Sequence, residues 1–95
     1  LTEEKFMIYT LETRYTVAHN LGYPIDTKTT HTFDRVRDAI KELRERVTNS
    51  KDNHCMRIIF EDDTLVILER NSMLGGKDRL EIEITIDGAN HNEEK

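Results

Sequence analysis

The chain has 95 residues, of which 36% are hydrophobic and 35% are charged, with 19 acidic and 14 basic side chains and a formal net charge of −5. A chain of this length buries about 60 to 65% of its unfolded surface, enough for one small core. The acidic balance argues against a general phosphate-binding surface, which needs clustered lysine and arginine. We therefore expect one domain over residues 1–88 and a flexible acidic tail over residues 89–95.

Cysteine content and hydropathy bear on the compartment. The single cysteine, Cys55, cannot form an internal disulfide, which is typical of proteins in a reducing cytoplasm. No apolar run approaches the roughly 20 residues that a membrane-spanning helix needs. Residues 1–5 lack the basic start and the apolar stretch of a signal peptide. A cytoplasmic protein without a membrane partner is expected.

The first part of the chain alternates in the manner of a β-strand. Between residues 5 and 19 apolar side chains recur at alternate positions, and those that share one face are Met7, Tyr9, Leu11, Tyr15 and Val17. This pattern predicts one long strand, or two strands broken near residues 12–14. Residues 20–32 then hold the only proline and four threonines. A connection of that length is typical of a binding loop or of a loop with a short extra strand.

Residues 33–47 show the clearest helical periodicity. The apolar side chains step by three and four residues, and they are Phe33, Val36, Ile40, Leu43 and Val47. Thr32 is a suitable N-cap, and Glu42 and Arg46 have the favoured i, i+4 spacing. The opposite side carries an acid stripe that is expected to face water, formed by Asp34, Asp38, Glu42 and Glu45.

Three further strands are predicted after a polar break at residues 48–53. Residues 54–61 and 64–70 are rich in aliphatic side chains and are separated by acids, which indicates a hairpin with a tight turn over residues 61–64. Gly75 and Gly76 mark the next turn. Residues 80–87 alternate without a break, so four aliphatics lie on one strand face and Glu81, Glu83, Thr85 and Asp87 on the other.

These elements predict an α+β fold. We expect an antiparallel sheet of four or five strands with one amphipathic helix packed on one face, in the order one or two strands, helix, strand, strand, strand. The helix covers only one face, yet residues 65–68 are four consecutive aliphatics, so two of them must point away from it. That second face, to which Phe6, Ile8 and Ile59 are also assigned, is covered by the 20–32 loop with Leu21, Tyr23 and Ile25, by a second copy in a homodimer, or by a partner.

No catalytic, metal or cofactor site is predicted. The histidines are dispersed at His19, His31, His54 and His91, without the paired spacing of zinc ligands. Cys55 lies in an aliphatic segment and is expected to be a buried hydrophobe rather than a nucleophile. Residues 75–77 lack the remainder of a phosphate-binding loop. The carboxylates of the last strand argue against nucleic acid.

The profile of a small acidic domain without a catalytic constellation is typical of a non-enzymatic binding protein. We expect an inhibitor or neutraliser of another protein, of the virus-encoded anti-defence or toxin-immunity type, that occludes its target's surface and meets a basic patch. The expected partner-binding residues are Asp38, Glu42, Glu45, Glu81, Glu83, Asp87, Tyr23 and Asp26. The alternative is a ligand-binding or enzymatic domain that uses the 20–32 loop, with Tyr23, Asp26, His31 and His19 around a pocket.

Overall fold

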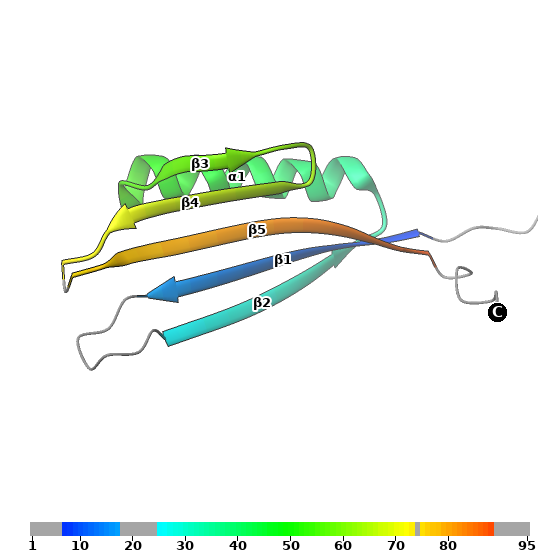
Figure 1. The fold of residues 1–95 in the computed structure, drawn as a ribbon. Coiled ribbons are helices and arrows are strands. Elements are labelled where there is room, and N and C mark those ends of the chain that lie inside the picture. The colour runs from blue at the N-terminus through cyan, green and yellow to red at the C-terminus, as the bar shows by residue number, and fades with distance from the viewer. Residues whose placement is uncertain (1–6, 18–24, 74, 89–95) are drawn as a thin grey trace, which may run out of the picture.

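A computed structural model describes residues 7–17, 25–73 and 75–88. Its elements in chain order are β1 (Met7–Val17), β2 (Ile25–Phe33), α1 (Val36–His54), β3 (Arg57–Glu61), β4 (Leu65–Asn71) and β5 (Lys77–Gly88). The strands form one antiparallel sheet in the order β2-β1-β5-β4-β3, and α1 lies across one face (Figure 1). The predicted α+β class and the predicted order of elements are confirmed.

The first hairpin differs from its prediction in where the second strand lies. Residues 7–17 are one continuous strand, so the break near residues 12–14 is absent. Most of the expected 20–32 loop is β2, which pairs with β1 from Tyr9 opposite Phe33 to Val17 opposite Ile25. β-branched threonines favour an extended chain, and the paired neighbour β1 supplies the ladder. The loop is therefore an edge strand, and Leu21 and Tyr23 of the suggested lid lie outside the described residues.

The helix begins later and ends later than predicted. Phe33 is the last residue of β2, Thr32 is no cap, and the N-cap is Arg35 without a side-chain hydrogen bond. The helix then continues through the polar residues 48–53 to His54. It ends where Cys55 adopts a left-handed conformation with φ of 56° and the Met56 N–H donates to the Ser50 carbonyl over 3.1 Å. The Cys55 N–H donates to the same carbonyl, and together these bonds close the last turn of the helix.

The buried face of α1 is rotated from the predicted apolar stripe. Ala39, Leu43 and Ser50 are buried, whereas Val36 is 43% exposed. Ala39 and Ser50 are small, so their burial lets the helix backbone approach the sheet. Glu42, of the predicted acid stripe, is partly exposed, and its carboxylate accepts a hydrogen bond from Arg46 Nε over 2.9 Å. That bond confirms the predicted i, i+4 pair.

The core lies between α1 and the middle of the sheet. Its buried side chains are Leu11, Ala39, Leu43, Met56, Val66, Leu68, Ile82 and Ile84. The alternation of β5 is as predicted, with Ile82 and Ile84 buried and Glu83 exposed. Ile86 continues the same row but is 55% exposed, so the row is longer than the part of it that the core covers.

The β3–β4 hairpin has the predicted turn and an unpredicted β-bulge. Asp62 Oδ1 accepts hydrogen bonds from the N–H groups of Thr64 at 2.9 Å and Leu65 at 2.8 Å, which closes the turn. Ile58 pairs with Leu68, but the register shifts before Phe60 pairs with Ile67. Directly opposite residues share a face, so Phe60 lies with Ile67 on the face away from α1, whereas an unbroken strand alternation would place it on the helix side with Ile58.

The strand boundaries around this hairpin also differ from the predicted ones. β3 begins at Arg57 rather than at residue 54, because His54 closes the helix and Cys55 caps it. The four consecutive aliphatics of β4 divide as predicted, with Val66 and Leu68 buried and the other two on the opposite face. The turn into β5 is confirmed, since Gly75 and Gly76 have φ of 92° and 78°, values that glycine adopts readily.

Candidate functional site: the outer sheet face and the cleft under the helix

The sheet face away from α1, here called the outer face, carries balanced charge. Residues paired across the sheet place five acidic and five basic described side chains on it, namely Glu12, Asp26, Glu69, Glu81, Glu83, Arg14, Lys28, Arg57, Lys77 and Arg79. Many are paired: Glu12 with Arg14 and Lys28, Glu69 with Arg57 and Lys77, and Glu81 with Arg79. This face therefore carries interspersed positive and negative charges rather than an acidic surface.

The predicted strand carboxylates have different surroundings. Glu81 lies on the outer face and is 2.9 Å from Arg79 Nε. Glu83 lies beside Leu65 and Glu12 in the ladder, and no ion pair joins it to another described side chain. Asp87 pairs with Ile8 near the end of β5. Between Glu81 and Glu83, Glu83 is therefore the carboxylate that is available to a cation from outside.

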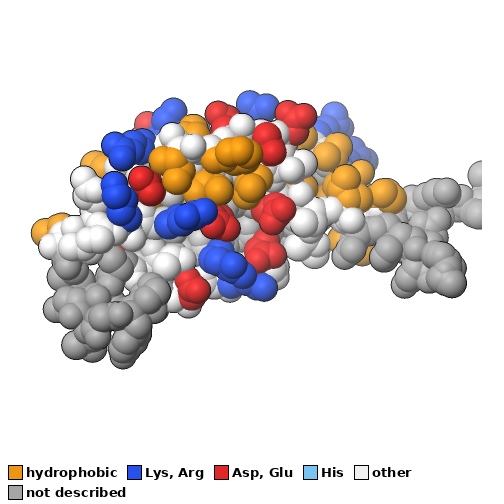
Figure 2. All heavy atoms as spheres, viewed as in Figure 1, with side chains coloured by type: hydrophobic (Ala, Val, Ile, Leu, Met, Phe, Trp, Pro, Cys, Tyr) orange, Lys and Arg blue, Asp and Glu red, His pale blue; other side chains and the backbone are white. Residues whose placement is uncertain are grey.

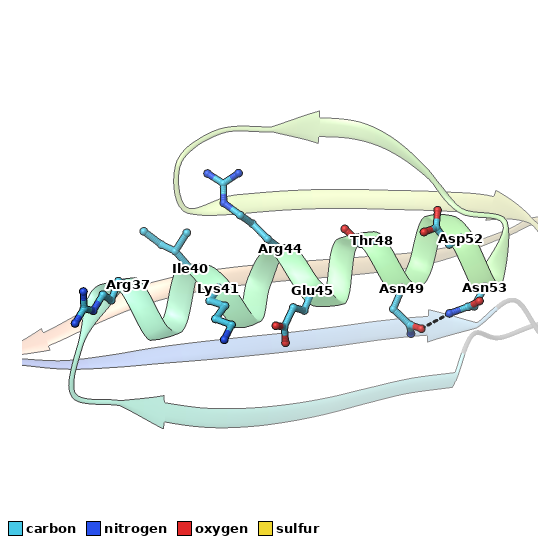
Figure 3. A pocket seen from close by; sticks show the side chains of 9 residues that line it. All are labelled: Arg37, Ile40, Lys41, Arg44, Glu45, Thr48, Asn49, Asp52 and Asn53. Atoms are coloured by element: carbon cyan, nitrogen blue, oxygen red, sulfur yellow. Dashed lines mark hydrogen bonds between the residues drawn. The ribbon is translucent and has the colours of Figure 1, made fainter.

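The predicted helix acids do not form a single-sign surface either. Asp38 and Glu45 are exposed, but Glu42 is held by Arg46. Figure 3 shows the solvent side of α1, where the basic side chains of Arg37, Lys41 and Arg44 precede the acidic ones of Glu45 and Asp52 along the helix, and these residues line a shallow hollow. Basic side chains therefore lie among the predicted helix acids, and the partner-binding role of Asp38, Glu42 and Glu45 stays a prediction.

An apolar patch lies among the charged side chains of the outer face, over β3 and β4. It is formed by Phe60, Leu65 and Ile67, here called the outer patch, of which Phe60 is 46% exposed. Ile59, at the bulge, is 45% exposed beside it. Figure 2 shows the apolar surface over this hairpin with acidic and basic side chains around it. The expected apolar excess on the second face is confirmed in this region.

Ile8, another expected member of the apolar excess, lies away from the outer patch. Leu65 of the patch lies in one row across the sheet with Glu83 and Glu12. Ile8 is on the same face and 41% exposed, but it is four positions along β1 from that row, about 13 Å away at the rise of a strand. Phe6 lies outside the described residues. The outer patch is thus a compact feature of one hairpin rather than a stripe along the whole sheet.

The opposite side of the same hairpin borders a groove. The groove, of about 840 Å³, lies between α1 and β3–β4, with Ile40, Leu43, Val47, Ile58 and Val66 among its lining residues. Arg44 and Lys51 line it from the helix, and Glu61, Asp62 and Asp63 from the hairpin. The helix backbone lies closest to β1, β2 and β5. The β3–β4 hairpin therefore projects beyond the cover that the helix gives.

Two arginines are fixed beneath the C-terminal half of α1. Arg46 donates from Nε to Glu42 over 2.9 Å and from Nη1 to Thr13 Oγ1 over 2.6 Å, and its Nη2 is 3.2 Å from His31 Nδ1. Because Thr13 is on β1 and His31 is on β2, Arg46 ties the helix to the first hairpin.

Arg70 makes the equivalent connection from the other side. It donates from Nε to Asp78 Oδ2 over 3.1 Å, from Nη1 to the His54 carbonyl over 2.8 Å and from Nη2 to the Tyr15 hydroxyl over 2.9 Å. Asp78 is buried. The hydrogen bond to Asp78 is the main reason that the pKa of Arg70 is raised from its ordinary value, against an opposing effect of burial.

A cleft of about 410 Å³, here called the arginine cleft, lies between these two guanidinium groups. It is lined by Thr13, Tyr15, Arg46, Asn49, Ser50, His54, Met56, Arg70 and Leu80. Sequence reasoning missed it. One signal was available: Arg70 and Asp78 are opposite each other and continue the inward rows of Leu68 and Leu80, which places a charged pair on the buried side.

The pocket expected around the 20–32 loop is not assembled by the described residues. Asp26 and His31 are separated by an odd number of positions on β2, so their side chains lie on opposite faces. Asp26 accepts a hydrogen bond from Thr16 on the outer face, and His31 contacts Arg46 under the helix. Tyr23, His19 and His91 lie outside the described residues.

Two further features of the described chain are the exposure of Cys55 and the arrangement of the residues that could bind a metal. Cys55 is the exposed C-cap of α1, so the expectation of a buried thiol is wrong. Within residues 7–17, 25–73 and 75–88, no group of three or more His, Cys, Asp or Glu side chains could hold a metal ion. In the same ranges no helix is long and apolar enough to span a membrane.

Comparison of the chain with protein-family models, with curated proteins and with solved structures gave no match.

Proposed function

We propose that this protein is a non-enzymatic binding protein that inhibits or neutralises another protein by covering part of its surface with the outer patch. The observation that carries the proposal is the β-bulge in β3, which turns the aromatic ring of Phe60 away from the core. Bulges commonly re-aim a side chain near a functional surface.

Without the bulge, β3 would be a regular strand with a different position for Phe60. In a regular strand Phe60 would follow Ile58 onto the helix side, where the groove beside α1 offers apolar contacts. Burying a phenylalanine there would add about 1.5 to 3 kcal/mol of stability. The observed register gives up that gain and leaves Phe60 beside Ile67 on the outer face. An exposed aromatic that is supported by aliphatic neighbours is a favourable anchor for a protein partner.

The surroundings of the outer patch indicate what the partner presents. The patch is bordered by charged side chains, as the rims of protein interfaces are. Glu83 lies next to Leu65 in the ladder and has no ion pair with another described residue. The fitting partner is a folded protein with a small apolar hollow that receives Phe60 and an adjacent lysine or arginine. Because the other charges are balanced, electrostatics would set orientation and association rate more than affinity.

Neither sheet edge favours strand addition as the binding mode. β3 has only five residues and carries the bulge, which disrupts the hydrogen-bond ladder. β2 is longer, but its described side chains are polar and exposed, with Lys28 among them, except for the partly buried Phe33. Both are devices that discourage edge-to-edge pairing. The contact is therefore made by the face of the β3–β4 hairpin.

The test uses capture from native cells with matched variants. A photo-reactive phenylalanine analogue in place of Phe60 should cross-link a defined protein, and the same protein should be retained by the unmodified chain but not by Phe60→Ser. Ile86→Ser is the control, because Ile86 is also an exposed aliphatic but lies on the other face. Equal retention by Phe60→Ser and the unmodified chain contradicts the proposal. Both variants are first checked for unchanged thermal unfolding.

Light scattering distinguishes a foreign partner from a second copy. The proposal expects the mass of one chain, 11.2 kDa, at micromolar concentration. A dimer that dissociates in Phe60→Ser would show that the outer patch binds a second copy and would replace the foreign partner in the proposal.

A further inference from the structure

The arginine cleft lies on the helix side of the sheet, opposite the outer patch, and is not needed for partner binding there. We infer that it binds a small organic dicarboxylate. The inference rests on how the two guanidinium groups are held, on what lines the space between them, and on their spacing.

Both guanidinium groups are already fixed in place. Each of the three nitrogens of Arg46 and of Arg70 has a protein partner. A guanidinium carries five N–H donors, so each arginine has donors beyond those three contacts. A fixed planar fork loses little conformational entropy when it binds a carboxylate. The two arginines are therefore prepared for an anionic ligand.

The lining of the cleft has positive charge without acidic groups. Arg46 and Arg70 line it, whereas their carboxylate partners Glu42 and Asp78 do not. The carboxylates thus orient the guanidinium groups from behind and leave the cleft side open to an anion. Additional donors from the Tyr15 hydroxyl and the Asn49 amide lie in the same lining.

The spacing and the remaining lining favour two carboxylates joined by a short apolar chain. Arg46 is anchored at Thr13 and Arg70 at Tyr15, two positions apart on one face of β1 and so about 7 Å apart along the strand. Between them, Met56 and Leu80 supply an apolar floor. A volume of about 410 Å³ is within the range of small-molecule sites. Carboxylates match the guanidinium fork in planar geometry.

Nuclear magnetic resonance titration of the intact chain tests the inference. Succinate and glutarate should each give saturable shifts of the resonances of Thr13, Tyr15, Ser50 and Leu80. Succinamide, which has the same carbon chain without charge, should give none. Inorganic phosphate should bind more weakly than either dicarboxylate, because it cannot span the two arginines.

Variants locate the site. Arg46→Gln should weaken dicarboxylate binding by about tenfold or more, since a hydrogen bond to a charged group is lost. Because that change also removes structural contacts, Asn49→Trp provides a second test: Asn49 is exposed at the cleft, so a bulky side chain there narrows it while both arginines are retained. Arg44→Gln is the matched control, because it removes the same charge from the helix outside the arginine cleft.

Three outcomes overturn the inference. They are the absence of saturable shifts with both dicarboxylates, equal weakening by Arg44→Gln and Asn49→Trp, and phosphate binding as tight as that of the dicarboxylates. Since the partner-binding test depends on Phe60 on the opposite face, failure of one proposal does not imply failure of the other.

Discussion

The two hairpins of this sheet use their residues in opposite ways. β1 and β2 pair without a register shift over nine positions, and the side chains of β2 are mostly threonine and other polar groups. β3 and β4 are shorter, contain a bulge, and carry aliphatic or aromatic side chains on both faces. Regular pairing completes the sheet in the first hairpin, whereas the second gives up regular pairing and gains an exposed aromatic. Structure and recognition are therefore concentrated in different hairpins.

The helix sharpens this difference. Its backbone lies closest to β1, β2 and β5, and Arg46 connects it to both strands of the first hairpin. The second hairpin is held by the side chains of Val66 and Leu68 and by Arg70. A hairpin that is fixed by a few buried side chains can present its other face to a partner without disturbing the core.

The largest expected effect on the free energy of unfolding is at Leu68, and Phe60 in the same hairpin provides the comparison. Leu68 is fully buried, so Leu68→Ala should lower the free energy of unfolding by about 2 to 5 kcal/mol. Phe60→Ala should cost less than about 1 kcal/mol, because Phe60 is already half in water. Urea denaturation measures both. Equal costs would mean that Phe60 is part of the core and that the bulge does not turn it outward.

The next effect concerns the anchor of the second hairpin. Asp78→Ala should cost about 1 to 3 kcal/mol, because it leaves Arg70 without its carboxylate partner in a half-buried position. A raised pKa of Arg70 gives stability that is present below its ordinary pKa and is lost only as the pH rises through the raised value. The cost should therefore be constant between about pH 6 and pH 9. Denaturation at both pH values checks this, and a cost that disappears at the higher pH would contradict it.

A smaller and opposite effect is expected where the helix joins the second hairpin. Cys55 has a positive φ of 56°, a conformation that glycine adopts at less cost. Cys55→Gly should raise the free energy of unfolding by about 0.5 to 1 kcal/mol. Cys55→Ser, which keeps a Cβ atom and a side chain of similar shape, is the control in the same thermal unfolding experiment. A loss of stability in Cys55→Gly alone would show that the cap is not strained.

The smallest effect belongs to the anchor of the first hairpin. Glu42→Ala should cost about 0.3 to 0.5 kcal/mol, the usual value for an i, i+4 pair with partial exposure. Glu45→Ala, at an exposed position on the same helix, should be silent within the error of chemical denaturation. If Glu42→Ala costs as much as Asp78→Ala, the two arginine anchors contribute equally to stability and the expected order of the two effects is wrong.

The sequence by itself determined the features that depend on local periodicity. The alternation of residues 80–87 follows from the two-residue repeat of a strand, and the structure has the same faces in β5. The turn at Asp62 could also be predicted, because its side chain bonds the backbone a few residues ahead whatever the rest of the fold does. The split of residues 65–68 between two faces follows from the same geometry.

The tertiary structure decided everything that depends on a neighbour far away in the sequence. β2 is a strand because β1 pairs with it, and the helix is rotated because the small residues Ala39 and Ser50 allow close approach to the sheet. The bulge at Ile59 and the inward positions of Arg46 and Arg70 have no local periodic signal. The bulge depends on the register between β3 and β4, and the two arginines depend on hydrogen bonds to β1, so both arise only when distant segments pair. Both candidate sites depend on these features, so the sequence predicted the scaffold and an apolar second face, while the folded chain determined which side chains form each site.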